Sequence, residues 1–282
     1  MKPTLSQVCS LHSTFAQDVE DYAAGHCKYL EIWLTKLEQF VASHSVEAAQ
    51  RLLAEHHMAA PVASFQGGLL TSQGEKRSEA WSLFTRRLEL LRELSIGTVV
   101  VACDVVQPLD QASIDRTRHS LEQIAVETGR RGLRAALEFQ ARSAFGNNLQ
   151  TAVALVAEVG SPHLGICLDW FHFYLGPSQF ADLELLSSSN LFHVQVADLA
   201  DVPREFATDS DRIMPGDGDM LMAPLLERLR AIDYQGCVSL ELMNPQIWEV
   251  PPRQFGEIGI TSLRRVLGQA SMQDGGGSNI EC

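Results

Sequence analysis

The sequence alternates short apolar runs with longer amphipathic stretches. Each run has the length of a buried strand, and its near-continuous hydrophobicity is typical of a parallel sheet covered on both faces. The runs comprise residues 5–11, 29–34, 60–65, 98–102, 133–139, 164–169, 191–196 and 236–242. We therefore expect about eight buried strands along the chain.

Apolar residues at helical spacing fill the intervals between these runs. They are Trp81, Phe84, Leu88 and Leu91; Ile114, Leu121, Ile124 and Thr128; Val153 and Val156; Leu221, Leu225, Leu226 and Leu229; and a last stretch at 252–267 that begins with prolines. Alternating strands and helices favour the α/β class, and about eight units in about 265 residues match a single (β/α)8 TIM barrel. A doubly wound sheet would need fewer strands and often a Gly-rich first turn, and neither GxGxxG nor a P-loop motif occurs.

Two segments do not follow this alternation of apolar runs and amphipathic stretches. Residues 197–220 form a connection of about 24 residues with little apolar content, and loops of that length are usually functional or disordered. This connection follows the seventh strand, on the face where barrel enzymes place their active sites. Residues 268–282 contain Gly-Gly-Gly-Ser, so we expect a flexible tail after a catalytic barrel of residues 1–267.

The composition narrows the classes of partner. The 282 residues include 22 Lys and Arg against 35 Asp and Glu, which gives a formal net charge of −13. This charge opposes binding to nucleic acid or to an anionic membrane surface. The six cysteines form no CxxC pair, so we expect reduced thiols and a cytoplasmic location. Neither a signal peptide nor a membrane-spanning apolar window is expected.

Acidic residues recur at the ends of the later strands. Glu138 ends the fifth run, Asp169 ends the sixth and Glu241 lies at the end of the eighth, while the seventh carries His193 and Gln195. Side chains at the carboxyl ends of barrel strands share one mouth. Three buried carboxylates repel one another unless a cation compensates them, which favours a metal site. The alternative is that each carboxylate meets an arginine or a helix N-terminus.

Four motifs in the second half of the chain resemble one superfamily. They are Ala-Leu-Glu-Phe at 136–139, Leu-Asp-Trp-Phe-His-Phe at 168–173, Thr-Asp-Ser-Asp-Arg-Ile-Met-Pro-Gly-Asp-Gly at 208–218 and Val-Ser-Leu-Glu-Leu-Met-Asn-Pro at 238–245. In this order they resemble the sugar phosphate isomerase/epimerase superfamily with its xylose isomerase-like barrel, and most of all the inosose isomerases. The resemblance runs from residue 133 to about residue 248, whereas the first half matches only as half of a barrel.

The resemblance implies a metal-dependent site. It assigns one divalent ion to Glu138, Asp169, a residue of the seventh strand and Glu241, and it gives Glu138 and Glu241 the roles of catalytic acid and base. Aligning the family pattern backwards from Asp211-Arg212 and Pro215-Gly216 places Gln195 rather than His193 at the seventh-strand position. With Gln195 the ligands are all oxygen atoms and favour manganese or magnesium, whereas His193 would admit zinc or cobalt.

Further residues are candidates for contacts with the substrate. The resemblance implies that His172 contacts substrate oxygens and that Arg212 points from the long loop into the site. Salt bridges of Arg212 with Asp209 or Asp211 are the structural alternative. Glu31, His193 and His12 face the mouth by their positions in strands two, seven and one. His193 has the alternative of a hydrogen-bonded core residue.

The implied activity is proton transfer next to a carbonyl. We expect an isomerase or epimerase of a sugar or polyol ketone, of the inosose or ketose type, acting through an enediolate. A metal-dependent dehydratase of the dehydroshikimate type would use the same residues and lose a β-hydroxyl instead. A DNA-repair endonuclease would need more histidine ligands and less negative charge, and a non-catalytic sugar-binding barrel would not need both glutamates. The expected partner is a small sugar or polyol, and a homo-oligomer is compatible with the sequence.

Overall fold

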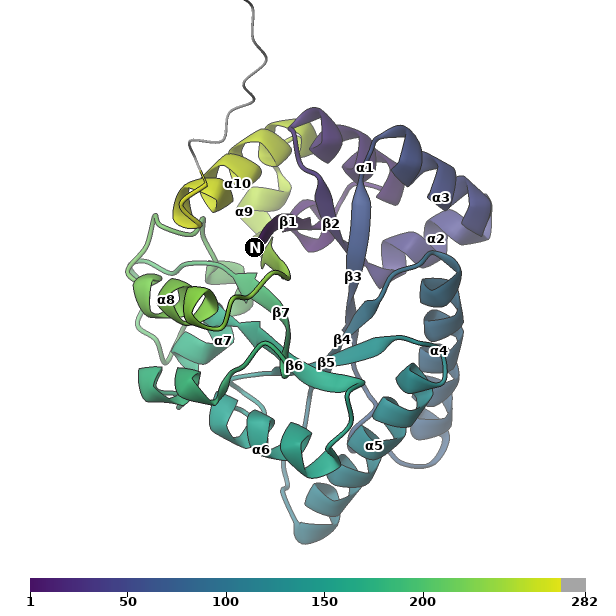
Figure 1. Ribbon diagram of the computed structural model, residues 1–282, viewed down its shortest axis with the longest axis vertical. Coiled ribbons are helices and arrows are strands. Elements are labelled where there is room, and N and C mark those ends of the chain that lie inside the picture. Colours follow the sequence, from purple (N-terminus) through teal and green to yellow (C-terminus); the bar gives the residue numbers. More distant parts are fainter. Residues whose placement is uncertain (270–282) are drawn as a thin grey trace, which may run out of the picture.

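Eight parallel strands form a closed barrel in the order of the chain (Figure 1). This computed structural model describes residues 1–269. The strands are β1 (Lys2–Ser6), β2 (Tyr29–Trp33), β3 (Ala59–Gln66), β4 (Thr98–Cys103), β5 (Arg134–Phe139), β6 (Leu164–Asp169), β7 (Leu191–Val196) and β8 (Cys237–Leu240). β8 pairs with β1 and closes the barrel, which confirms the predicted (β/α)8 fold. Of the predicted tail, only Gly268 and Gln269 fall within the described residues.

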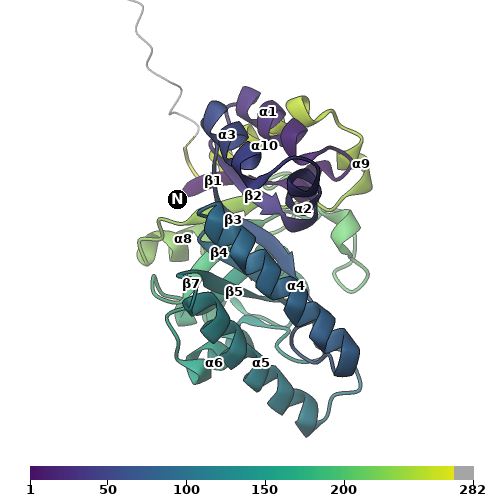
Figure 2. The same cartoon turned by 90° about the vertical axis from the view of Figure 1, so that its right-hand side faces the viewer.

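Helices surround the strands on the outside, as Figures 1 and 2 show from two directions. They are α1 (Phe15–Ala24), α2 (Leu34–Ser43), α3 (Val46–Glu55), α4 (Gly74–Glu93), α5 (Gln111–Gly129), α6 (Leu149–Val159), α7 (Trp170–Leu175), α8 (Ala223–Ala231), α9 (Pro245–Trp248) and α10 (Pro252–Val266). Short 3-10 helices lie at η1 (Gln7–Ser10), η2 (Phe180–Leu185) and η3 (Asp209–Asp211). No helix among the described residues combines the length and the hydrophobicity that crossing a membrane requires.

The first strand begins earlier and ends earlier than the apolar pattern predicts. Its partners in β8 fix its position, with Lys2 beside Cys237 and Leu5 beside Leu240. The side chain of Ser6 then accepts a hydrogen bond from the Val8 amide and starts η1. Residues 7–10 are therefore buried as a 3-10 helix rather than as a strand. His12 follows this helix in an exposed turn, so its predicted place at a strand end is wrong.

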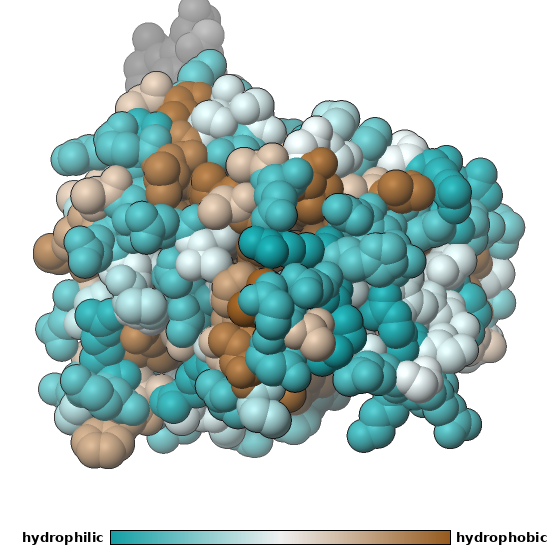
Figure 3. Space-filling model, turned by 90° about the horizontal axis from the view of Figure 1, so that it is seen from below, coloured by the Kyte–Doolittle hydropathy of each residue, from teal (hydrophilic) through white to brown (hydrophobic). Residues whose placement is uncertain are grey.

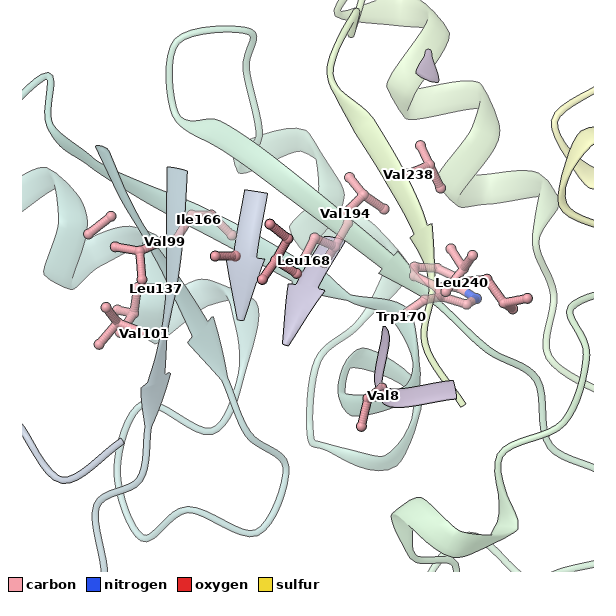
Figure 4. Close-up of a cluster of buried hydrophobic side chains, with 14 of the residues drawn as sticks. Val8, Val99, Val101, Leu137, Ile166, Leu168, Trp170, Val194, Val238 and Leu240 are labelled. Carbon is pink, nitrogen blue, oxygen red and sulfur yellow. The ribbon is translucent and has the colours of Figure 1, made fainter. Parts of the chain in front are cut away.

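The two faces of the strands carry different apolar clusters. Side chains that point outward pack against the helices, and Figure 4 shows Val99, Leu137, Ile166, Leu168 and Val194 among them. The alternate positions point into the barrel. There a smaller cluster consists of Val62, Val100, Ala136, Cys167, Phe192 and Cys237. This inner cluster lies toward the amino ends of the strands, which leaves the carboxyl ends to polar side chains.

Helices from the two ends of the chain close the ring together. α10 packs against α1 at two glycines, where a Cβ on Gly25 would lie 2.7 Å from the Glu257 nitrogen and one on Gly256 would lie 3.1 Å from the Tyr22 Cα. Only glycine allows the two backbones to approach this closely. Hydrophilic side chains dominate the face seen in Figure 3, with hydrophobic ones in smaller areas between them. The five cysteines of the described residues, Cys9, Cys27, Cys103, Cys167 and Cys237, are buried free thiols.

The long connection after β7 is ordered around one buried carboxylate. Asp198 pairs with Ile213 through two backbone hydrogen bonds of an isolated bridge. The Asp198 carboxylate also accepts hydrogen bonds from four backbone amides, those of Leu199, Gly216, Gly218 and Met220, at 2.9 to 3.1 Å. A Cβ on Gly218 would collide with this carboxylate. The loop is thereby folded back over the barrel mouth, with Arg212 on its inner side.

Candidate active site and metal centre

Strand register brings the predicted site residues to one mouth. Asp169 on β6 pairs directly with Gln195 on β7, and Gln195 pairs with Ser239 on β8. Residues that pair across parallel strands point to the same face, here the barrel interior. Glu138 on β5 has the same orientation, and Glu241 follows the end of β8. The side chains of Glu138, Asp169, Gln195 and Glu241 are all buried.

Arg212 connects two of these carboxylates. Its Nη2 donates to Asp169 Oδ2 at 2.7 Å, and its Nη1 donates to Glu241 Oε2 at 3.1 Å. It also bonds Asp209 at 2.8 Å, and its guanidinium lies 4.5 Å from the centre of the Phe171 ring. The Arg212 side chain has no exposed surface. The salt bridge to Asp209 that was the alternative interpretation of Arg212 is present. The alternative interpretation of the carboxylates is also present in part, because Asp169 and Glu241 both meet this arginine.

Gln195 joins a second network below the mouth. Its Nε2 donates to Glu31 Oε1 and to Glu241 Oε1, both at 2.9 Å, while its Oε1 accepts from the Cys167 thiol at 3.0 Å. His193 lies 2.9 Å from the other Glu31 oxygen. Glu31 and His193 are fully buried and do not line the cavity at the mouth. They support Gln195 from inside the barrel.

His172 lies beside the carboxylates at the start of α7. Asp169 Oδ1 accepts the amides of Phe171 and His172, at 2.8 and 3.4 Å, and so starts the helix. His172 Nε2 then lies 3.7 Å from Asp169 Oδ2, and its buried Nδ1 has no hydrogen-bond partner. One ligand atom each from Glu138, Asp169 and His172 lie within 4.8 Å of one another. These three residues can contact one cation together.

Burial and charge shift the acidities in opposite directions. Burial, reinforced by the negative charge of Asp169, raises the pKa of Glu138 to about 8. Burial raises the pKa of Glu241 well above its usual value, and Arg212 compensates this only in part. Burial alone would also raise the pKa of Asp169, but the Arg212 charge brings it below its usual value. His193 lowers the pKa of Glu31 in the same way, against the effect of burial.

The donor set fits a divalent cation. Glu138, Asp169 and Glu241 are three buried acidic groups, and the buried guanidinium of Arg212 pairs with two of them, Asp169 and Glu241. The raised pKa values of Glu138 and Glu241 show that one positive charge does not compensate them. A second, divalent charge would stabilise the ionised forms of these carboxylates and lower their pKa values. Carboxylate oxygens are ligands that magnesium and manganese prefer.

A cavity of about 410 Å³ opens above these groups. It is lined by Trp33, Phe65, Glu138, Gln140, Ala141, Arg142, Phe171, His172, Leu175, Thr208, Asp209, Glu241 and Met243. Gln140, Arg142 and Met243 were not among the predicted site residues, although Gln140 and Met243 each lie two residues beyond a predicted glutamate. Gln140 donates to Glu138 Oε2 at 3.1 Å. A larger groove of about 810 Å³ lies outside the barrel between α4 and α5 and contains none of the predicted site residues.

Comparison with known proteins identifies the family. Residues 22–265 match the model of the xylose isomerase-like TIM barrel family. The chain belongs to this family. An inosose isomerase of Halalkalibacterium halodurans is 27% identical over 256 residues, which cover 89% of this chain and 90% of the relative. A 3-dehydroshikimate dehydratase of Pseudomonas putida is 31% identical over 180 residues, which cover 63% of this chain but 28% of that larger protein.

Solved structures of the family agree with this fold. The IolI protein, determined with a bound zinc atom, superposes with a TM-score of 0.89 at 23% identity and covers 97% of this chain and 100% of that one. A D-psicose 3-epimerase determined with D-fructose superposes with a TM-score of 0.78 at 20% identity, covering 95% and 100%. At these identities the likeness shows the fold alone.

Proposed function

We propose that this protein is a divalent-metal-dependent isomerase or epimerase of a sugar or polyol ketone. The family and the inosose isomerase relatives support an enzyme of the sugar isomerase and epimerase class. The observation that carries the proposal is the acidic group at the mouth, in which Glu138 and Glu241 both border the cavity and both have raised pKa values. A carboxyl with a raised pKa can act as a general acid, and once ionised it is a stronger base than an ordinary carboxylate.

We propose that a single divalent ion, with manganese or magnesium preferred, is bound by Glu138, Asp169, Glu241 and Gln195. His172 would lie beside this ion. When bound, such an ion polarises the carbonyl of a ketone and makes the neighbouring C–H more acidic. Ligation by Gln195 requires its amide to turn, because its nitrogen faces Glu241 while its oxygen faces Cys167. An acidic mouth and the zinc atom of the IolI structure support a metal without fixing which one.

The chain's own groups suggest how a proton moves. Gln140 holds Glu138 Oε2, so that the other oxygen is free to take a proton from the carbon next to the carbonyl. Arg212 holds Glu241 Oε2 and places a positive charge near the negative charge that develops on the substrate oxygens. Glu241, which is protonated at the start of the reaction, then gives its proton to the opposite face or to the neighbouring carbon, and solvent afterwards takes the proton from Glu138 and reprotonates Glu241.

Isotope exchange tests this proposal. The protein, with Mn²⁺ added, is incubated in deuterated water with inososes, open-chain ketoses and hydroxypyruvate, and NMR follows the loss of the C–H signal. We expect exchange with at least one ketone in the native protein and its loss in Glu138→Gln with substrate binding retained. No exchange with any of these ketones would rule out the isomerase, and unchanged exchange in Glu138→Gln would remove Glu138 from the reaction.

A dehydratase is the second candidate, because a Pseudomonas putida 3-dehydroshikimate dehydratase is 31% identical over 180 residues of this chain. The same two glutamates would then remove a proton and release a β-hydroxyl as water instead of returning the proton to carbon. Incubation with 3-dehydroshikimate separates the two activities. A growing ultraviolet absorbance of an aromatic product indicates the dehydratase, whereas deuterium incorporation without that absorbance indicates the isomerase.

A further inference from the structure

Glu241 lies just beyond the part of β8 that pairs with β1. The last paired residues of these two strands are Leu5 and Leu240. The backbone of β1 does not continue along β8, because residues 7–10 turn away into η1. On its other side, the Glu241 amide donates to the Val196 carbonyl of β7 at 3.1 Å. Strand pairing therefore holds Glu241 from the β7 side, and the backbone on the β1 side needs another partner.

The thiol of Cys9 supplies this partner. It accepts a hydrogen bond from the Leu242 amide at 3.1 Å and donates to the Leu240 carbonyl at 3.3 Å. One side chain of η1 thus bonds the residue before Glu241 and the residue after it. Cys9 has no exposed surface, so both bonds lie in the protein interior, where an unpaired backbone group is costly.

Side chains of two other helices hold η1 in place. The Lys36 ammonium of α2 donates to the carbonyls of Gln7 and Ser10, at 3.0 and 2.6 Å. The Trp248 indole of α9 donates to the Val8 carbonyl at 2.8 Å. Three of the four backbone carbonyls of η1 are thereby bound by neighbouring helices, so the thiol of this segment has a fixed position.

The backbone of Glu241 determines where its carboxylate lies. Glu241 Oε2 accepts from Arg212 at 3.1 Å, and Oε1 accepts from Gln195 at 2.9 Å. A shift of this backbone would disturb both bonds and would move the carboxylate relative to Glu138 and Asp169. Metal ligands and proton-transfer groups tolerate little displacement, so a group that fixes the Glu241 backbone bears directly on the chemistry of the site.

We propose that Cys9 is a positioning residue, which holds Glu241 where this carboxylate binds the metal ion and transfers a proton. The thiol takes the place of the backbone contact that a longer β1 would make. It acts through Glu241 and does not line the cavity itself. The inference rests on the proposed function and deepens it by naming a residue that sets the geometry of the site from outside the cavity.

Manganese binding tests this role without turnover. The affinity is measured by titrating the full chain with Mn²⁺ and following the free ion by electron paramagnetic resonance, well below the melting temperature of each variant. In Cys9→Ala we expect about tenfold weaker binding, because groups that orient metal ligands contribute at least this much to affinity. Cys9→Ser keeps a donor and an acceptor and should recover most of the affinity.

A matched control separates the two hydrogen bonds from the loss of a buried thiol. Cys237→Ala makes the same substitution in β8 itself, at the opposite end of the strand, where Cys237 belongs to the inner apolar cluster. This variant should bind manganese like the native protein. In the isotope-exchange assay, Cys9→Ala should lower kcat about tenfold with little change in KM, because proton transfer depends on the placement of Glu241 more than substrate binding does.

A double variant shows whether Cys9 acts through Glu241. Glu241→Ala removes the ligand itself, so adding Cys9→Ala to it should weaken manganese binding no further. A general loss of order in the barrel would instead weaken binding by the same factor whether or not Glu241 is present. The comparison therefore tests the coupling of the two residues directly.

The outcomes separate this inference from the proposed function. The role of Cys9 would be overturned by native affinity in Cys9→Ala, by an equal loss in Cys237→Ala, by a serine variant no better than the alanine one, or by a further loss in the Glu241→Ala background. Manganese binding that follows the expected pattern, without isotope exchange on any ketone, would support Cys9 and remove only the isomerase activity. A native protein that binds no manganese would overturn this role together with the proposed manganese site.

Discussion

Arg212 and Asp169 form a fully buried ion pair with 2.7 Å between Nη2 and Oδ2. The same guanidinium reaches Glu241 with its Nη1, so a single loop residue spans the ends of β6 and β8. Removing one partner of a buried pair leaves the other charge without compensation, which is far more costly than the net stabilisation that the pair provides. The pair therefore couples the position of the long loop to the charge of the site.

Two substitutions of Arg212 distinguish the effect of its positive charge from the effect of its planar, two-pronged side chain. In Arg212→Ala we expect a loss of about 3 to 5 kcal/mol in the free energy of unfolding, because Asp169 and Glu241 lose their buried cation. Arg212→Lys keeps the charge but cannot bridge two carboxylates with a planar fork. It should lose less stability than the alanine variant while losing at least about tenfold in turnover. Urea unfolding and the exchange assay measure the two effects, and an alanine variant as stable as the native protein would contradict the prediction.

Metal content tests the seventh-strand position. If Gln195 is a ligand, Gln195→Ala should lose bound manganese, whereas His193→Ala should keep it. Gln195→His should shift preference toward zinc, because imidazole suits zinc better than an amide oxygen does. Elemental analysis after dialysis against each metal gives the occupancy, with the exposed Glu75→Gln as a control for surface binding. Full occupancy in Gln195→Ala together with loss in His193→Ala would reverse the assignment.

Sequence patterns predicted the positions of the site residues better than their partners. Strands alternate their side chains, so Glu138, Asp169 and Gln195 could be placed at one mouth from the apolar runs alone. The sequence predicts that Arg212 points into the site and offers a local salt bridge with Asp209 or Asp211 as its alternative. Which carboxylates Arg212 meets depends on the path of a loop without periodicity, so its pairing with Asp169 and Glu241 in particular could not be predicted. The end of β1 was misplaced because residues 7–10 are buried as a 3-10 helix, and burial alone does not distinguish that helix from a strand.

A pH dependence of stability is expected from Asp104. Burial raises the pKa of its carboxyl, whose Oδ2 accepts the Gly68 amide at 2.6 Å. Between the usual pKa and the raised one, the folded protein binds more protons than the unfolded chain, so the free energy of unfolding falls as pH rises through this window. Asp104→Asn keeps an acceptor and removes the charge, so its stability should lack this fall.

Unfolding in urea at pH values from about 4 to 7 measures the difference between the native protein and Asp104→Asn. The free energy of unfolding of Asp104→Asn should increase relative to that of the native protein as pH rises from the usual pKa of an aspartate to the raised one. Above the raised pKa, the difference between the two proteins should stay constant. Asp115→Asn is the control, since Asp115 is exposed on α5. Parallel pH profiles for the native protein and Asp104→Asn would show that burial does not shift this carboxyl.

Asp198 is expected to position Arg212 without touching the substrate. Its two carboxylate oxygens accept four backbone amides, two at each oxygen, and so hold residues 199–220 against the barrel. In Asp198→Asn the amide nitrogen cannot accept, so the amides that met that oxygen lose their partner. We expect a loss of about 2 to 4 kcal/mol in the free energy of unfolding.

The loosened loop should also lower turnover more than substrate binding, because Arg212 would sample positions away from Glu241. The matched control is Asp219→Asn, an exposed aspartate on the same loop, which should leave both quantities unchanged. A purely structural role for Asp198 predicts a different result, namely lower stability with native kcat at temperatures where the variant is folded. Measuring kcat and KM well below the melting temperature of Asp198→Asn distinguishes the two, because only a displaced Arg212 reduces kcat in a protein that remains folded.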